Sequence, residues 1–219
     1  MATVTIQKSL DRRGKTITTF VVFDVVAQLE TMDEGEVLEL FTDDYEPLRT
    51  DIAAWCEASG PVLLSAEAMS TGTRFLIEKR PPKAKDTSMA MVISNPGLEE
   101  LLSPLGFALA AALEGIQVHL FLQGPAVRVL VDGFRPKLTG WYRRPFSRFA
   151  ASGLTKTGHI PAQDKIRQLR SLDAEVYLCA PSMEHFKVDP EKLIFDDLPI
   201  VEYLTFMSVM EGADIPLYI

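Results

Sequence analysis

The second half of the sequence alternates short apolar runs with segments of helical periodicity, and this pattern restricts the fold more than any other feature. Apolar runs lie at residues 90–94, 117–122, 175–178 and 215–218, and helical spacing covers residues 98–114, 124–131, 161–172 and most of 199–210. Strands that alternate with helices form a parallel sheet whose connections cross its faces. We therefore expect residues 89–219 to form an α/β domain with a doubly wound, mostly parallel sheet.

The first half has a different order of elements. Strand patterns lie at residues 4–6, 37–41, 62–69 and 73–78, and helical patterns at residues 20–31 and 48–58. This β-α-β-α-β-β order predicts a two-layer sandwich over residues 1–80, with both helices on one face of the sheet. Residues 81–88 begin with Pro81 and Pro82, carry charges and lack apolar periodicity, so we interpret them as a linker between two domains.

The charge and the cysteine count exclude several classes of protein. A formal net charge of −8 at pH 7 disfavours binding to nucleic acid or to a membrane surface. Cys56 and Cys179 are too few for a disulfide framework, and even with the three histidines they match no recognised metal-site spacing. The most apolar window, 101–122, is interrupted by polar residues, and the N-terminus lacks a signal-peptide core. We expect a cytoplasmic protein with no metal, organic cofactor, nucleic-acid partner or membrane partner.

Cys179 lies at a junction that favours a reactive thiol. It follows the apolar run 175–178, and Pro181 and Ser182 are typical of a first helical turn. A thiol at this position faces backbone N–H groups and the positive end of a helix dipole, which stabilise the nucleophilic thiolate. A cysteine after an apolar strand is equally compatible with an inert buried side chain, so the local pattern leaves both interpretations open.

Polar or small residues follow the neighbouring strands at the same edge of the expected sheet. Ser94 and Asn95 end one apolar run, and Gln123 and Gly124 follow another. Ligands of doubly wound sheets bind outside the carboxyl ends of the strands. We therefore expect these residues to converge with Cys179.

A long, poorly periodic segment, residues 134–159, interrupts the alternation of strands and helices. It is rich in aromatic and basic residues, and no carboxylate occurs between Asp132 and Asp164. One interpretation is an oligomer or domain contact, and the other is a mobile flap that bears on Cys179 and attracts an acidic partner or an anionic sulfur species. RNA binding is disfavoured by the acidity of the chain. The candidate flap residues are Arg135, Trp141, Tyr142, Arg143 and Arg144.

The N-terminal half resembles the TusA (SirA-like) sulfur-carrier domain. The resemblance rests on residues 10–14, 34–36, 42–44, 51–60 and 75–79. TusA carriers hold a Cys-Pro-x-Pro motif shortly after their Leu-Asp-x-x-Gly segment, and its cysteine carries a persulfide. Here the same offset from Gly14 reads Ile17-Thr-Thr-Phe20, and Cys56 lies elsewhere, in the second expected helix. The resemblance therefore implies a degenerate carrier kept for docking or scaffolding.

The C-terminal half resembles the DsrE family, especially its second type. The matching stretches are residues 115–118, the sequence Cys179-Ala-Pro-Ser-Met183 and residues 213–219. This resemblance implies sulfur relay, in which Cys179 accepts a sulfane sulfur from a donor persulfide, holds it as Cys–S–S⁻ and passes it to an acceptor thiol.

The same resemblance implies roles for the residues around Cys179. Ser182 and the amides near Met183 would stabilise the anion, and Ser94, Asn95 and Gly124 would shape the floor of the persulfide pocket. His185 would either tune the thiolate or lie exposed on the surface.

Two classes of function follow. The first is a sulfurtransferase-like persulfide carrier with sulfur donor and acceptor proteins as partners. The second is a non-catalytic adaptor in sulfur trafficking, suggested by the lost carrier motif. A nucleotide or flavin binder is disfavoured, because neither GxGxxG nor GxxxxGK[ST] follows any expected strand. DsrE-like proteins typically assemble, and Leu217 and Ile219 leave apolar surface near the terminus, so we expect a homo-oligomer.

Overall fold

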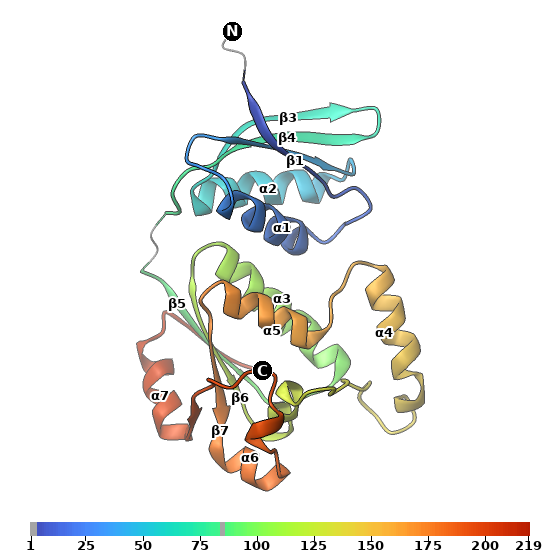
Figure 1. The fold of residues 1–219 in the computed structure, drawn as a ribbon. Coiled ribbons are helices and arrows are strands. Elements are labelled where there is room, and N and C mark those ends of the chain that lie inside the picture. Colours follow the sequence, from blue (N-terminus) through green and yellow to red (C-terminus); the bar gives the residue numbers. More distant parts are fainter. Residues whose placement is uncertain (1–3, 84–85) are drawn as a thin grey trace. The chain divides into compact units, whose positions relative to one another are not determined.

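The computed structural model describes residues 4–83 and 86–219 (Figure 1). Residues 1–3 of the expected first domain and residues 84 and 85 of the expected linker 81–88 lie outside the described residues. The chain divides into two compact units, residues up to 83 with 113–115, and residues 86–112 with 116–219. Of the helices that the structure describes, none has the length and apolarity needed to span a bilayer.

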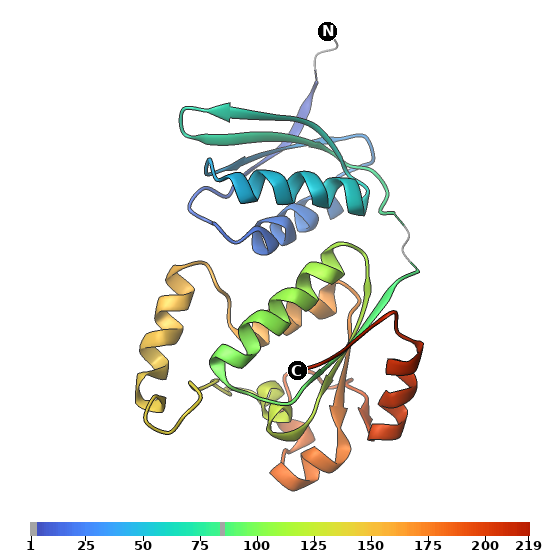
Figure 2. The same ribbon diagram turned by 180° about the vertical axis from the view of Figure 1, so that it is seen from behind.

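The N-terminal unit is a four-stranded sheet with two helices. Both helices lie on one face of the sheet, as Figures 1 and 2 show. Its elements are β1 (Ile6–Asp11), α1 (Thr18–Glu30), β2 (Val37–Thr42), α2 (Glu46–Ser59), β3 (Val62–Met69) and β4 (Gly72–Glu78). The strand order is β1-β2-β4-β3, with β1 parallel to β2 and the other pairs antiparallel. The expected β-α-β-α-β-β sandwich is confirmed.

The position of the first strand was predicted wrongly. The expected strand covered residues 4–6, whereas β1 begins at Ile6 and ends at Asp11. Its pairing with β2 decides the position, because the register matches Lys8 with Leu38 and Asp11 with Phe41. Val4 remains 45% exposed, so its apolar side chain contributes little to the core.

The β3–β4 hairpin requires glycine at its turn. Gly72 has a φ of +134°, and a Cβ at this position would come within 2.0 Å of the Thr42 carbonyl oxygen. Any side chain would therefore clash with backbone that cannot move aside. Beneath the hairpin, Leu38, Phe75 and Ile77 are fully buried against α1 and α2, and such burial contributes about 2 kcal/mol for each side chain.

The C-terminal unit confirms the doubly wound, parallel sheet. Its strands are β5 (Ser88–Ile93), β6 (Gln117–Leu122), β7 (Glu175–Cys179), β8 (Ile200–Val201) and β9 (Ile215–Tyr218). The order is β8-β7-β6-β5-β9, and every pair is parallel. Helices α3 (Leu98–Leu113) and α5 (Ala162–Ser171) lie on one face and α7 (Tyr203–Gly212) on the other (Figures 1 and 2).

One side chain anchors α7 to the sheet. Phe206 is 2% exposed, and its ring stacks on Phe121 of β6 with centroids 4.5 Å apart. Tyr177 of β7 packs edge-on against the same ring at 5.4 Å. The rest of α7 is more exposed, as Leu204 and Met207 illustrate, so this helix is held by few buried contacts.

The connections after β6 and β7 contain short helices. After β6 come the 3₁₀ helices η1 (Gly124–Leu130) and η2 (Arg144–Phe146) and the helix α4 (Ser147–Lys156). After β7 come α6 (Ala180–Phe186) and η3 (Pro190–Lys192). The segment 134–159 therefore contains regular structure that its sequence pattern did not indicate.

Candidate functional site

Cys179 ends β7 and caps α6. It is the last residue of the strand and the N-cap of the helix, with Pro181 in the first turn. The strand-to-helix junction expected from the sequence is therefore present. The Cys179 side chain is fully buried, at 0% exposure. Any reaction at its sulfur requires that a neighbouring group move.

A hydrogen-bond chain leads from the backbone of one strand end to the Cys179 sulfur. The Ser182 hydroxyl donates to Cys179 Sγ at 3.0 Å. The same hydroxyl oxygen accepts a hydrogen bond from the Gly124 N–H at 2.8 Å. The backbone N–H thus fixes the oxygen and directs the hydroxyl hydrogen toward the sulfur. The Ser182 hydroxyl is therefore the hydrogen-bond donor that faces the Cys179 sulfur.

Tyr203, the first residue of α7, completes the surroundings of the sulfur. A hydrogen bond with Cys179 raises the pKa of the Tyr203 hydroxyl above its ordinary value, so the phenol remains protonated and able to donate. Sheet register explains the contact, because Cys179 pairs with Val201 of β8, two residues before Tyr203. Tyr203 is 51% exposed, so it joins the buried sulfur to a side chain that reaches solvent.

A second polar cluster lies at the next strand ends. The Gln123 side-chain amide donates to the Ser94 hydroxyl at 2.9 Å and to the Tyr218 hydroxyl at 2.6 Å. The register pairs Ile93 with Leu122, which places Ser94 beside Gln123 one step further along. Ser94 is therefore two strands away from Cys179, with β6 between them.

The other residues expected in the persulfide pocket differ in whether hydrogen bonds link them to the Cys179 sulfur. Gly124 reaches it through Ser182. Asn95 uses its side-chain oxygen to accept the Gly97 N–H at 3.0 Å, at the start of α3. Met183 is buried within α6. The structure thus brings Ser182 to the sulfur directly and Gly124 indirectly.

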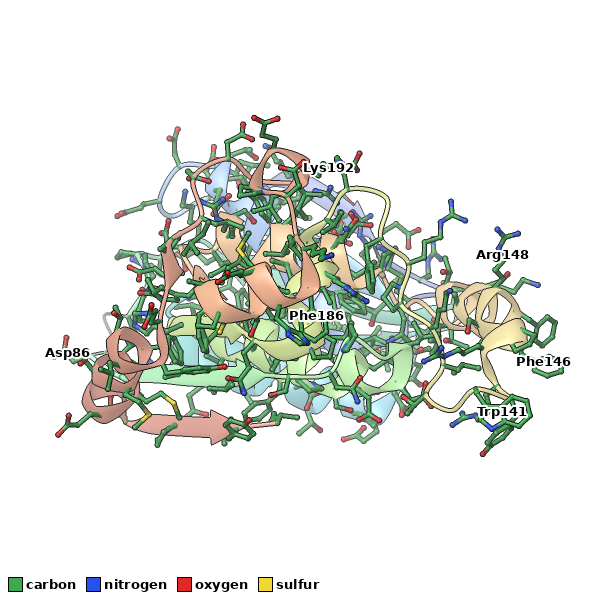
Figure 3. All side chains as sticks on the ribbon, turned by 90° about the horizontal axis from the view of Figure 1, so that it is seen from below. Asp86, Trp141, Phe146, Arg148, Phe186 and Lys192 are labelled. Atoms are coloured by element: carbon green, nitrogen blue, oxygen red, sulfur yellow. The ribbon has the colours of Figure 1, made fainter. Side chains whose placement is uncertain are left out.

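His185 and the candidate flap lie apart from these hydrogen bonds. The His185 ring is exposed in the last turn of α6 and packs edge-on against Phe186, with centroids 4.7 Å apart. In Figure 3, Trp141, Phe146 and Arg148 project from the outer end of the segment 134–159, away from Phe186. Trp141 and Tyr142 are 83% and 65% exposed, and Arg143 pairs with Glu99 of α3 at 2.7 Å. Arg135 and Arg144 line a cavity beside α3.

Two residues at this edge were missed by sequence reasoning, Tyr203 and Tyr218, whereas Gln123 was expected there together with Gly124. The rule that selected Ser94 and Gly124, that residues just after a parallel strand face a common edge, applies to each of them. Gln123 follows β6, Tyr203 follows β8 and Tyr218 ends β9. The strand positions therefore place these residues at the edge, but the contact of Tyr203 with Cys179 depends on the pairing of β8 with β7.

Cys56 lies in a different environment from Cys179. It is buried in α2, and burial raises the pKa of its thiol to about 12. A thiol with this pKa is almost entirely un-ionised at neutral pH and is a poor nucleophile. Among residues 4–83 and 86–219, no group of three or more His, Cys, Asp or Glu side chains is arranged to hold a metal ion.

Comparison with known proteins places the C-terminal unit in a family. The pattern of the DsrE/DsrF-like family matches residues 88–211, more than half of the chain. Among solved structures, the chain is similar to the ychN protein from E. coli, with a TM-score of 0.44 and 14% sequence identity over 61% of this chain and 99% of that one. None of the curated proteins compared with the chain matches it. On the match over residues 88–211, the chain belongs to the DsrE/DsrF-like family.

Proposed function

We propose that this protein is a cytoplasmic sulfur-relay protein that carries sulfane sulfur as a persulfide on Cys179 and passes it to an acceptor thiol. Membership of the DsrE/DsrF-like family, which is generally linked to sulfur relay, supports this proposal. The observation that carries it is the hydrogen bond from the Ser182 hydroxyl to the Cys179 sulfur at 3.0 Å. An inert core cysteine needs no such donor.

The proposed reaction is two thiol–persulfide exchanges without net oxidation. The Cys179 thiolate attacks the terminal sulfur of a donor R–S–SH, so that Cys179–S–SH forms and R–S⁻ leaves. An acceptor thiolate then attacks the outer sulfur of Cys179–S–SH, takes it as R′–S–SH, and Cys179 leaves as the thiolate. Each step breaks one bond to the transferred sulfur and forms another. Ser182 stabilises the anion on Cys179 at the start and at the end of the cycle.

Access to the sulfur is the step that needs movement. Cys179 is fully buried, whereas Tyr203, which interacts with it, is 51% exposed. Because α7 is anchored chiefly by Phe206, rotation of Tyr203 or local opening of α7 would expose the sulfur at low energetic cost. We propose that Tyr203 is the cover of this site, and that Ser94, Asn95, Gly124 and Met183 shape the surrounding pocket.

The N-terminal unit and the assembly complete the proposal. We propose that the N-terminal unit is a TusA-like domain that has lost its carrier cysteine and serves to dock sulfur donor or acceptor proteins. We also propose a homo-oligomer, because several apolar side chains near the end of the chain are exposed: Tyr203, Leu204, Met207, Tyr218 and Ile219. Nucleic acid and membranes are not among the proposed partners.

The second candidate function is a non-catalytic adaptor. The complete burial of Cys179 favours it, because a sulfur closed to solvent cannot meet a donor thiol unless the cover moves. In that case both units would act only as binding surfaces in sulfur trafficking.

Loading and release distinguish the two functions. The full chain is treated with a small-molecule polysulfide, freed of excess reagent, and its intact mass is measured before and after addition of a thiol. The proposal predicts one added sulfur that the thiol removes, in the wild type and in the matched control Cys56→Ser, but none in Cys179→Ser. An adaptor would gain no sulfur in any of the three forms.

A further inference from the structure

The C-terminal unit contains a cavity of about 860 Å³ whose lining includes no residue of the Cys179 site. Its walls come from α3, the loop 133–137, α4 and the start of α5. Small-molecule sites in proteins commonly have volumes of about 300–1,000 Å³. The cavity is therefore large enough for a small organic ligand.

The walls of this cavity are mainly apolar. Leu98 and Leu101 of α3 line one side, and Ala151 and Leu154 of α4 line another. Phe134 and Ile160 close it from the connecting loops. Water gains few hydrogen bonds against such walls, so an apolar ligand body would release it at a gain in free energy.

Basic side chains gather at one part of the lining. Arg135, Lys137 and Arg144 line this cavity and also a smaller one of about 290 Å³ beside it. Within the described part of the chain, no carboxylate forms an ion pair with any of the three, whereas neighbouring Arg143 pairs with Glu99 at 2.7 Å. The three cations thus lack close ion-pair partners among the described residues, and the one carboxylate of the described lining, Asp164, pairs with Arg167 at 2.7 Å.

Another cation of the lining lies deeper. Lys165 of α5 is 2% exposed, and its ammonium group donates a hydrogen bond to the Leu102 carbonyl oxygen at 3.0 Å. Burial lowers the pKa of Lys165 to about 8, which measures how unfavourable its charge is in this environment.

We propose that this cavity binds a small organic anion with an apolar body, of the medium-chain carboxylic acid class. The hydrocarbon lies against the leucines of α3 and the apolar side chains of α4. The carboxylate meets the cluster of Arg135, Lys137 and Arg144 and is attracted by the charge on Lys165. The segment 134–159 then serves as the wall of a binding site, a role that is independent of sulfur transfer at Cys179.

The test is calorimetric titration of the full chain with decanoate and with decan-1-ol, which share the apolar body and differ in charge. The proposal predicts that one decanoate binds per chain and that the alcohol binds about tenfold more weakly. Arg144→Gln should weaken decanoate about tenfold and leave the alcohol unchanged. Arg143→Gln, the matched control outside the lining, should leave both unchanged.

Variants that fill the cavity test whether the ligands bind inside it. Ala151→Trp places a bulky ring in the lining and should abolish binding of both ligands, with Leu154→Phe as a milder variant if the first does not fold. Circular dichroism checks the fold of every variant. The proposal is overturned if decanoate does not bind the wild type, if the alcohol binds as tightly, or if a folded cavity-filling variant binds as the wild type does.

Discussion

The Ser182 hydroxyl donates to the Cys179 sulfur at 3.0 Å while it accepts the Gly124 N–H at 2.8 Å. One oxygen thus joins the end of β6 to the junction of β7 and α6. Ser182 therefore has two roles. Its hydroxyl hydrogen bonds to the Cys179 sulfur, and its oxygen fixes the position of the Gly124 backbone N–H. The first role affects the loading rate of Cys179 and the second the free energy of unfolding, so the two can be measured separately.

Ser182→Ala should slow the persulfide loading of Cys179 about tenfold, because the thiolate loses its hydroxyl donor. The change should also lower the free energy of unfolding by about 1–2 kcal/mol, since the Gly124 N–H loses its acceptor. Ser182→Thr keeps a hydroxyl and should restore most of the rate. A loading rate that is equal in the alanine and threonine variants would show that the hydroxyl has no role at the sulfur.

Tyr203→Ala should make Cys179 react faster with iodoacetamide, because the change removes the side chain that we propose as its cover. Leu204→Ala, at the next and more exposed position, is the matched control and should leave the rate unchanged. Cys56, whose pKa is raised to about 12 by burial, should stay unmodified in the folded protein. Peptide mass spectrometry reports both cysteines in one experiment, and an unchanged Cys179 rate would mean that Tyr203 is not the cover.

The titration of Tyr203 should respond to Cys179. A hydrogen bond with Cys179 raises the pKa of Tyr203, so Cys179→Ala should lower that pKa toward the ordinary tyrosine value. The pKa of Tyr177, which burial and Glu175 raise, should be the same in Cys179→Ala and in the wild type. NMR titration of ring-labelled tyrosine follows both residues, and an unaltered Tyr203 curve would contradict the contact.

Lys165 should make stability depend on pH in the alkaline range. Its pKa falls from 10.5 to about 8 on folding because of burial, so the folded state binds the proton less tightly than the unfolded state. Below pH 8 both states are protonated and the full destabilisation is present; above about pH 10.5 both are neutral and it disappears.

Lys165→Met should therefore raise the free energy of unfolding more at pH 7 than at pH 10, by about 2 kcal/mol. Denaturant unfolding at the two pH values measures the difference. Lys156→Met, at an exposed position on α4, is the control and should show no such difference. An equal effect of the Lys165 change at both pH values would contradict the lowered pKa.

Much of the fold follows from local patterns in the sequence. The apolar runs that form β5, β6 and β7 are short, and helical segments separate them along the chain. This alternation of strands and helices is typical of a parallel sheet. The junction at Cys179 was predictable for the same reason, because Pro181 and Ser182 mark a helix start within three residues of the strand end.

The features that were missed depend on distant pairings. Tyr203 reaches Cys179 only because β8 lies beside β7 in register, and no local pattern near residue 203 indicates this. β1 starts later than expected because pairing with β2 decides its extent. The helix α4 was not predicted, because it lacks a continuous apolar face that packs in the core. Ala151 and Leu154 line a cavity, and Phe149 is 84% exposed.

The most direct measurement is tandem mass spectrometry of the wild-type chain after native treatment with a sulfane-sulfur donor that loads a known carrier. The account predicts one additional sulfur atom on the peptide that contains Cys179, and none on the peptide that contains Cys56. An unmodified Cys179 peptide under these conditions would contradict the account.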